Sequence, residues 1–375
     1  MCLVINTEVF PITALIFANA WLVLLLAAQL MSIYSAFKEK GKGAVLKERP
    51  KIAVLIAVWN EALHIEHCID SLLKQDYPRN KYKIVVVGGG TDNTMKICKK
   101  LEKEGKIKYL PEKERKGKWV ALNNGINWIK HNVRDCYAVA LLDGDYVIEP
   151  DWLNDLVANS FKHDIVINRI KSASTKTLVG TMAVIYYTLY NYFIPVFSKI
   201  FGACAWMGQS SLIKMHVFDK VMFENSLVED MRFGVTARMK GFSIAFSNSL
   251  ACHAIPKDVN SFRKELMRAL NGIYAELLPR LELFPLFLFI LPLLIIVGFP
   301  LWVYEIISFE LSTVIISVLL LLVTIIDLKS CKLRVTDFPI LVFLVLACLA
   351  IYIETIARML TNKNIGWPLI DKVRD

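Results

Sequence analysis

The tripeptide Asp143-Gly144-Asp145 is the place in this sequence where the residue types are best suited to chemistry. It follows an apolar run at residues 137–142 (YAVALL), which predicts a buried strand. Two carboxylates after a strand, separated by a glycine that lets the backbone turn sharply, suit a hard divalent cation. Mg²⁺ or Mn²⁺ takes oxygen ligands, often one or two carboxylates with the rest from phosphates and water. A surface turn can have the same composition, so the surrounding elements are needed to distinguish a metal site from a turn.

Strands and helices alternate along the chain before this tripeptide. Short apolar runs predict strands buried in a parallel sheet, and helices follow the first three of them. The predicted strands are residues 51–58, 83–87, 107–110 and 137–142, and the predicted helices begin at residue 60, run through residue 99 and span residues 121–129. This order predicts a doubly wound α/β fold with a mostly parallel sheet. Ligands bind beyond the carboxyl ends of such strands, where Asn60, Gly88-Gly89-Gly90 and Asp143 all fall.

The hydrophobic residues of the 375-residue chain are gathered into long uncharged runs. They make up 55% of the chain, and the mean hydropathy is +0.46, which excludes a disordered protein. A helix of about 20 apolar residues can cross the roughly 30 Å hydrocarbon layer of a membrane. We expect such spans within residues 9–33, 283–304, 311–326 and 338–353. The first run is longer than the apolar part of a signal peptide, and no basic residue precedes it.

These runs divide the chain into three parts. We expect an N-terminal transmembrane helix in residues 1–37, a cytosolic α/β domain in residues 38–282, and about three transmembrane helices and a tail in residues 283–375. Basic residues after the first span favour the cytoplasm; they are Lys38, Lys40, Lys42, Lys47, Arg49 and Lys51. Four spans starting outside would place the C-terminus outside, yet the tail after Glu354 is also basic. We expect four spans and leave the side of the C-terminus open.

Charge and cysteine content agree with this arrangement. The net charge of +10 indicates contact with anionic lipid headgroups rather than nucleic acid, because basic residues cluster beside the spans and no nucleic-acid motif is present. Eight cysteines without a CxxC pair or disulfide-scaffold spacing fit the reducing cytosol. We therefore expect a multi-pass integral protein of the cell membrane with membrane lipids, but no nucleic acid, among its partners.

Five short motifs follow one another in the α/β region. They are AVWNE at residues 57–61, SLLKQDYP at 71–78, GKWVALN at 117–123, DGD at 143–145, and LVED at 227–230 followed by GF at 241–242. In this order and spacing they resemble the inverting family 2 nucleotide-sugar glycosyltransferases of the GT-A fold, over about residues 50–280. The chain departs from that family at Ala57, where the family has proline, and at residues 87–92 (VGGGTD), where the family's D-D-G-S-x-D keeps only Asp92.

The resemblance implies an enzyme that transfers a sugar from a nucleotide-diphosphate sugar with inversion at the anomeric carbon. It places Asp230 as the base that removes the proton of the acceptor hydroxyl, with Glu229 and Arg268 as further catalytic residues. Each has a simpler alternative. Asp230 could be a charge that favours a helix N-terminus, and Arg268 could be a helix-surface charge near lipid headgroups.

The resemblance also implies a donor site with a divalent cation. It assigns donor contacts to Asn60, Glu61, Asp92, Lys118 and Asp143. Mg²⁺ or Mn²⁺ at Asp143 and Asp145, helped by Lys118 or Arg268, would stabilise the charge that develops on the nucleoside diphosphate. For Lys118 the alternative is a solvated basic loop.

The acceptor is expected to be lipid-linked or a glycan, because both ends of the α/β domain are tethered to the membrane. Residues 177–198 are uncharged and rich in tyrosine and phenylalanine. They cannot cross a membrane if Asp143 and Asp230 share one site, so we expect an interfacial segment near residues 177–206, with a core helix of the domain as the alternative.

Two other functions stay open. A processive polysaccharide synthase is one, although the Q-x-x-R-W motif of polymer-making relatives survives only as Glu265 to Ala269 (ELMRA). The other is a membrane transporter or scaffold with a non-catalytic α/β domain. No charged residue lies inside the four uncharged runs, which weighs against transport.

The glycine run predicts weak discrimination between nucleobases. In relatives that use uridine donors, an aspartate of the D-D-G stretch accepts a hydrogen bond from N3–H of the base, and here glycine stands in that stretch. Loss of a charged acceptor removes roughly 1.5–3 kcal/mol of recognition, about tenfold to a hundredfold in affinity. We predict that uridine and guanosine diphosphates, as product inhibitors at saturating Mg²⁺ or Mn²⁺, differ by less than about tenfold. A preference of about a hundredfold would show that another residue reads the base.

Overall fold

The computed structural model describes residues 46, 48–172, 177–184, 186–187, 210–256 and 258–277, together with residues 314–315, 354 and 372–373. The expected spans lie outside the described residues, apart from residues 314–315. Within the described part of the chain, no helix combines the length and the apolar character that a membrane crossing requires.

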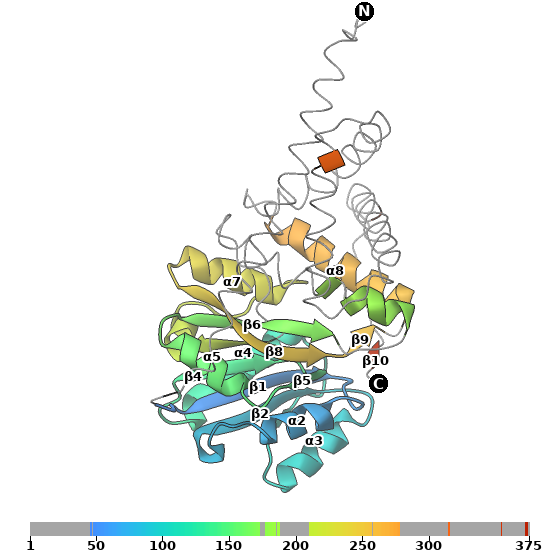
Figure 1. Cartoon of the computed structure of the whole chain (residues 1–375). Helices are drawn as coiled ribbons and strands as arrows, with labels where there is room; N and C mark the ends of the chain where they lie inside the picture. The colour runs from blue at the N-terminus through green and yellow to red at the C-terminus, as the bar shows by residue number, and fades with distance from the viewer. Residues whose placement is uncertain are drawn as a thin grey trace, which may run out of the picture.

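The centre of the molecule is one sheet of eight strands in the order β3-β2-β1-β4-β7-β6-β8-β5 (Figure 1). The strands are β1 (Ile52–Trp59), β2 (Tyr82–Gly89), β3 (Lys108–Pro111), β4 (Ala138–Leu142), β5 (Tyr146–Ile148), β6 (Ile165–Ser172), β7 (Ser210–Lys214) and β8 (Ile244–His253). The first half, from β3 to β4, is parallel as predicted. The second half is mixed: β7 is antiparallel to β4 and β6, β8 is parallel to β6, and β5 is antiparallel to β8.

Helices cover both faces of this sheet. They are α2 (Ile65–Leu73), α3 (Thr94–Lys103), α4 (Lys118–Asn132), α5 (Trp152–Ser160), α7 (Glu229–Met239) and α8 (Val259–Leu277). Alternate residues of β1 point to opposite faces, so Val54 and Ile56 join the core that includes α2, while Ala53 and Leu55 join the core that includes α4. Gly125 lets α4 lie close to the sheet, because a Cβ there would be 2.3 Å from Leu55 Cδ1.

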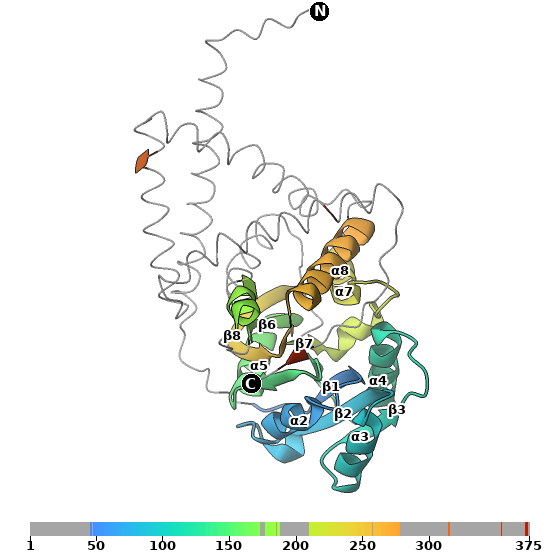
Figure 2. The same cartoon turned by 90° about the vertical axis from the view of Figure 1, so that its right-hand side faces the viewer.

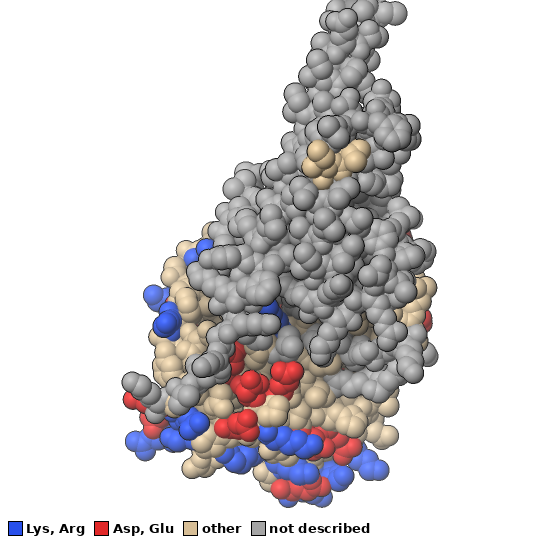
Figure 3. All heavy atoms as spheres, in the orientation of Figure 1, with Lys and Arg blue, Asp and Glu red and all other residues tan. Residues whose placement is uncertain are grey.

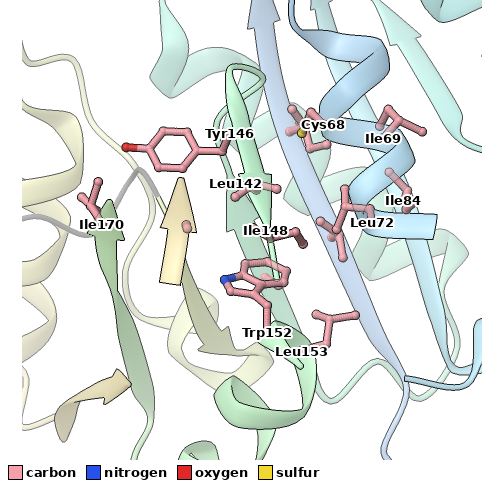
Figure 4. Close-up of a cluster of buried hydrophobic side chains, with 14 of the residues drawn as sticks. Cys68, Ile69, Leu72, Ile84, Leu142, Tyr146, Ile148, Trp152, Leu153 and Ile170 are labelled. Atoms are coloured by element: carbon pink, nitrogen blue, oxygen red, sulfur yellow. The ribbon is translucent and has the colours of Figure 1, made fainter. Parts of the chain in front are cut away.

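The larger core is organised around Trp152, the first residue of α5. Its side chain is fully buried and lies near Ile148 and Leu72 (Figure 4). The indole Nε1–H of Trp152 donates to Ser210 Oγ over 3.0 Å, so the polar end of the ring is satisfied inside the core. This core joins α2, α5 and the strand ends that lead into the DGD tripeptide.

The helix predicted from residue 60 begins five residues later, at Ile65. Asn60 has a φ of 61°, in the left-handed region, and Leu63 is 77% exposed although the periodicity placed it on the apolar face. The reason is a set of longer-range hydrogen bonds, such as the one from Glu61 N–H to Thr94 Oγ1 at 2.8 Å, which hold residues 60–64 as a loop.

The described part of the expected interfacial segment packs as a core helix. Val179, Met182 and Ala183 are buried, and the Tyr186 ring contacts Phe262 of α8 with centroids 5.8 Å apart. In Figures 1 and 2 this green segment lies near α8. These residues therefore favour the core-helix alternative, while residues 188–206 lie outside the described ranges.

A second, two-stranded sheet joins distant parts of the chain. β9 (Ile255–Pro256) directly follows β8, and β10 (Lys372–Val373) pairs with it in antiparallel fashion. Arg263 of α8 also forms an ion pair with Glu354. Residues 354 and 372–373 are thus in contact with the α/β domain.

The surface over α2 and α3 carries charges of both signs. Lys100 of α3 pairs with Glu66 of α2 over 3.4 Å, and Lys108 pairs with Glu102 over 2.8 Å. Figure 3 shows acidic and basic side chains intermingled along the lower edge of the molecule. Exposed pairs of this kind contribute little to stability, so the fold depends on the two apolar cores.

Candidate active site

The loop after β1 forms one wall of the candidate site. Asn60 Oδ1 accepts a hydrogen bond from Thr91 N–H at 2.7 Å, and Asn60 N–H donates to Gly89 O at 3.3 Å. Gly90 is required for this contact, because a Cβ there would lie 2.5 Å from Asn60 Oδ1. The carboxyl ends of β1 and β2 therefore meet, and they place Asn60 beside the glycine run.

Asp92 organises the same loop. Its carboxylate accepts from Thr94 N–H at 2.9 Å, from the Thr94 hydroxyl at 2.6 Å and from Ala62 N–H at 3.2 Å. Partial burial raises the pKa of Asp92, but these hydrogen bonds outweigh burial and hold the pKa below its ordinary value. Asp92 was predicted to contact the donor, and the structure shows it first as the group that fixes the loop carrying Asn60 and Glu61.

The glycine run is packed against backbone. Gly88 has a φ of 134°, and a Cβ there would lie 1.9 Å from Val58 O. Gly88 O accepts from the Tyr109 hydroxyl at 2.9 Å and from Glu112 N–H at 2.8 Å. A carboxylate side chain could not be accommodated at Gly88 without moving β1. The packing of the sheet therefore requires glycine where the family's D-D-G has its second aspartate.

Lys118 joins the DGD turn to the start of α7. It is the first residue of α4 and follows Gly117, whose φ of 107° lets the chain turn into the helix. Lys118 Nζ lies 2.7 Å from Asp143 Oδ1 and 3.6 Å from Glu229 Oε1. The alternative of a solvated loop lysine is therefore wrong for Lys118, because the side chain is largely enclosed by carboxylates.

Glu229 and Asp230 open α7, and both are buried. Asp230 Oδ1 accepts from Met231 N–H at 2.8 Å, which fixes the orientation of its carboxylate. Arg268 reaches this region from α8, where its guanidinium donates to Leu227 O at 3.2 Å. The arginine is thus partly buried behind the acidic pair and is not a helix-surface charge.

Burial sets the protonation of the Glu229–Lys118 pair. Burial, reinforced by Asp230, raises the pKa of Glu229 to about 7, and the attraction of Lys118 and Arg268 only partly offsets this. Burial lowers the pKa of Lys118. The negative charges of Asp143, then Glu229 and Asp230, raise it by more, so the pKa of Lys118 lies above its ordinary value. Lys118 is charged at neutral pH, and its main partner is Asp143.

The donor set at Asp143 and Asp145 fits a divalent cation whose remaining ligands come from a diphosphate and water. Asp143 already holds a positive group, the Lys118 ammonium. Burial, and then the charges of Asp145 and Asp143, raise the pKa of the adjacent Tyr146 phenol well above its usual value. Within the described ranges, no three His, Cys, Asp or Glu side chains lie together as a metal cluster.

A cluster of aromatic and acidic side chains beside Asp145 was not predicted from the sequence. The rings of Tyr146 and Tyr187 contact His253 with centroids 5.5 and 4.2 Å apart, and the Tyr187 hydroxyl donates to Glu265 at 2.9 Å. Ala254 N–H donates to the Asp145 carbonyl at 3.2 Å, which ties β8 to the DGD turn. Glu265, in the sequence ELMRA, and Tyr187, in the uncharged run at residues 177–198, belong to segments that the sequence singled out, but neither was predicted to lie beside the DGD turn.

The predicted site residues therefore form two adjoining groups. Lys118 joins Asp143 to Glu229, next to Asp230, and Arg268 approaches from behind. Asn60, Glu61 and Asp92 form the other group around the loop after β1. The two meet at Gly144, where a Cβ would lie 3.3 Å from Glu61 Cγ.

A parallel α/β half-sheet with these charged groups at its carboxyl edge defines the class of the protein as a glycosyltransferase with a GT-A-like fold. The structure of mannosyltransferase PcManGT from Pyrobaculum calidifontis in complex with GDP-Man and Mn²⁺ has the same fold, with a TM-score of 0.57, 19% identity, and coverage of 92% of this chain and 100% of that one. The chain belongs to the family 2 glycosyltransferases: residues 138–353 match the model Glycosyl transferase family group 2, and residues 53–220 match Glycosyl transferase family 2.

Two curated relatives are each similar over about two thirds of the chain. Glycosyltransferase AglE of Haloferax volcanii is 26% identical over 256 residues, covering 67% of this chain and 81% of that protein. The poly-beta-1,6-N-acetyl-D-glucosamine synthase of Staphylococcus aureus is 24% identical over 267 residues, covering 68% of this chain and 62% of the synthase.

The raised pKa of Glu229 predicts a pH-dependent stability. The folded protein holds this proton more firmly than the unfolded chain, so the contribution is fully present below about pH 4.5 and is lost as the pH rises through about 7. In the unsubstituted protein, the free energy of unfolding should fall by about 3 kcal/mol over this window because of Glu229. We predict that this decline is absent in Glu229→Gln. Urea unfolding of both proteins between pH 4.5 and 8 measures the difference, and parallel pH profiles would contradict the buried-carboxyl assignment.

Proposed function

We propose that this enzyme transfers a sugar from a nucleotide-diphosphate sugar, with inversion, to a lipid-linked or glycan acceptor at a membrane surface. The observation that carries the proposal is the contact of Lys118 with both Asp143 and Glu229 at the carboxyl edge of the sheet. This contact brings the donor end of the site to the two carboxylates that open α7.

In this proposal the residues of the chain have separate roles. Asp230, oriented by Met231 N–H, takes the proton of the acceptor hydroxyl as that oxygen attacks the anomeric carbon from the face opposite the leaving group. Lys118 and Arg268 provide positive charge on the side where the diphosphate leaves. Mg²⁺ or Mn²⁺ held by Asp143 and Asp145 would supply further neutralisation of the diphosphate. The loop of Asn60, Glu61 and Asp92 would position the nucleoside.

The PcManGT complex contains GDP-Man and Mn²⁺, and this supports the metal and the type of donor, although the likeness of the two proteins concerns the fold. For this chain, the two carboxylates around Gly144 and the adjacent cationic side chains are the observation on which the metal assignment depends.

Processive polymer synthesis is a second candidate, favoured by the likeness to the Staphylococcus aureus synthase. Where polymer-making relatives carry Q-x-x-R-W, the chain keeps the arginine as Arg268 and has Glu265 in place of the glutamine. Glu265 accepts a hydrogen bond from Tyr187, and Arg268 donates to the Leu227 carbonyl. Separation of radiolabelled products by length on a gel distinguishes the two, because single transfer gives one band and processive synthesis gives a ladder or a high-molecular-weight product.

Contacts between the C-terminal residues and the α/β domain limit how the chain can cross a membrane. β10 pairs with β9, and Glu354 pairs with Arg263, so residues 354 and 372–373 lie on the same side as the α/β domain. If the uncharged runs between residues 283 and 353 cross a membrane, they must do so an even number of times. We therefore propose that two of the three runs cross and that the basic tail is cytoplasmic, in place of the four-span arrangement expected above.

We predict that Asp230→Asn lowers the transfer rate by at least about 100-fold while affinity for the nucleotide sugar stays within a few-fold, because a base acts on the acceptor. Radiolabelled transfer to membrane lipid extracts and calorimetry of donor binding measure the two quantities. Asp143→Asn is the matched variant, since it should weaken both donor binding and the dependence on Mn²⁺. Equal loss of donor affinity in the two variants would assign Asp230 to the donor site.

We predict that a cysteine placed in the tail, Asp375→Cys, is protected from a membrane-impermeant maleimide in intact cells and is labelled after lysis. Glu104→Cys, an exposed site at the end of α3, is the cytosolic control, and the unmodified chain gives the background of its own thiols. Labelling of the tail cysteine in intact cells, with Glu104→Cys protected, would contradict an even number of crossings.

A further inference from the structure

The Lys118 ammonium contacts one of the two carboxylates proposed to hold the divalent cation, Asp143. The ammonium is 2.7 Å from Asp143 Oδ1, and the lysine side chain is only 22% exposed. A Mg²⁺ ion lies about 2.0–2.1 Å from its carboxylate oxygens. A metal ion on the same carboxylate would be within a few ångströms of the ammonium, and like charges at that separation repel strongly outside bulk water.

The structure also provides a second place for the ammonium. Glu229 Oε1 lies 3.6 Å from Lys118 Nζ, and the Glu229 side chain is only 4% exposed. A lysine has a flexible four-carbon stem, so a small rotation is enough to move its ammonium from Asp143 toward Glu229. This movement would leave the Asp143 carboxylate to the metal and strengthen the ion pair at the start of α7.

We propose that Lys118 is an internal placeholder cation: it neutralises Asp143 in the donor-free enzyme, competes with the divalent cation for that carboxylate, and shifts to Glu229 when the metal and donor bind. The inference rests on the proposed metal-dependent donor site. It adds that metal binding and the Glu229 ion pair are coupled through one side chain. Donor loading would thereby strengthen the ion pair of Glu229 beside Asp230, the proposed base.

The test measures Mn²⁺ binding to the full chain in detergent at pH 7.5, without nucleotide, by electron paramagnetic resonance. We expect Lys118→Met to bind Mn²⁺ about tenfold more tightly than the unsubstituted protein, because a charge-assisted contact that opposes metal binding is gone. Lys118→Arg keeps the charge and should bind Mn²⁺ no more tightly than the unsubstituted protein. An ion pair with a purely structural role would give the opposite sign, because its loss would loosen the site.

Lys130→Met is the matched control. Lys130 lies near the other end of α4 and forms a pair of similar length, 2.8 Å, with Asp219. Its substitution should leave Mn²⁺ affinity within about twofold. Circular dichroism and thermal unfolding establish that each variant is folded.

A double-mutant cycle tests the shift to Glu229. Glu229→Gln should weaken Mn²⁺ binding about tenfold when Lys118 is present, because the ammonium then stays on Asp143. In the Lys118→Met background the same substitution should weaken it less than about threefold. Equal effects of Glu229→Gln in the two backgrounds would overturn the shift.

The remaining outcomes separate the inference from the proposed function. Unchanged or weaker Mn²⁺ binding by Lys118→Met, with measurable binding by the unsubstituted protein, would overturn the placeholder and leave the metal site standing. Absence of Mn²⁺ binding by every variant, with and without nucleoside diphosphate, would overturn the metal site and the inference together.

Discussion

The positive charge of Lys118 allows the buried carboxylates of Glu229 and Asp230 to lie close to the partly exposed carboxylate of Asp143. Asp143 directly follows β4, while Glu229 and Asp230 begin a helix more than 80 residues later. Without a cation among them, their mutual repulsion and the loss of hydration would force protonation or drive the elements apart. Even with Lys118 and Arg268 in place, burial and the charge of Asp230 raise the pKa of Glu229 to about 7.

The architecture around the lysine serves to hold it there. Gly117 turns the chain into α4, and Gly125 lets that helix approach β1 closely enough to pack on Leu55. On the far side, Gly272 lets α8 approach the loop before α7, because a Cβ there would be 2.5 Å from Val228 Cγ1. The position of Arg268 behind Leu227 follows from this close packing. Two helices pressed against the sheet thus determine the geometry of the charged cluster.

The parallel half of the sheet was predictable from sequence because each of its strands is a short apolar run followed by a local motif. The DGD turn could be located in the same way. The start of α2 could not, since hydrogen bonds from residues 60–64 to Thr94 and Asp92 override the apolar periodicity of Leu63. The contacts of Tyr187 with His253 and Glu265 could not be predicted either, because they join residues more than 60 positions apart and no local pattern pairs these residues with one another.

The pairing of β10 with β9 has a consequence for the synthesis of the protein. Ile255 is buried beside Ala254, which bonds the carbonyl of Asp145. Its partner strand leaves the ribosome roughly 115 residues later, which takes roughly 6–23 s at about 5–20 residues per second. During this interval the edge of β9 has not yet met β10, and an open edge is a surface on which other strands can pair. The nascent chain is therefore most exposed to mispairing after its α/β domain has been made and before residues 372–373 arrive.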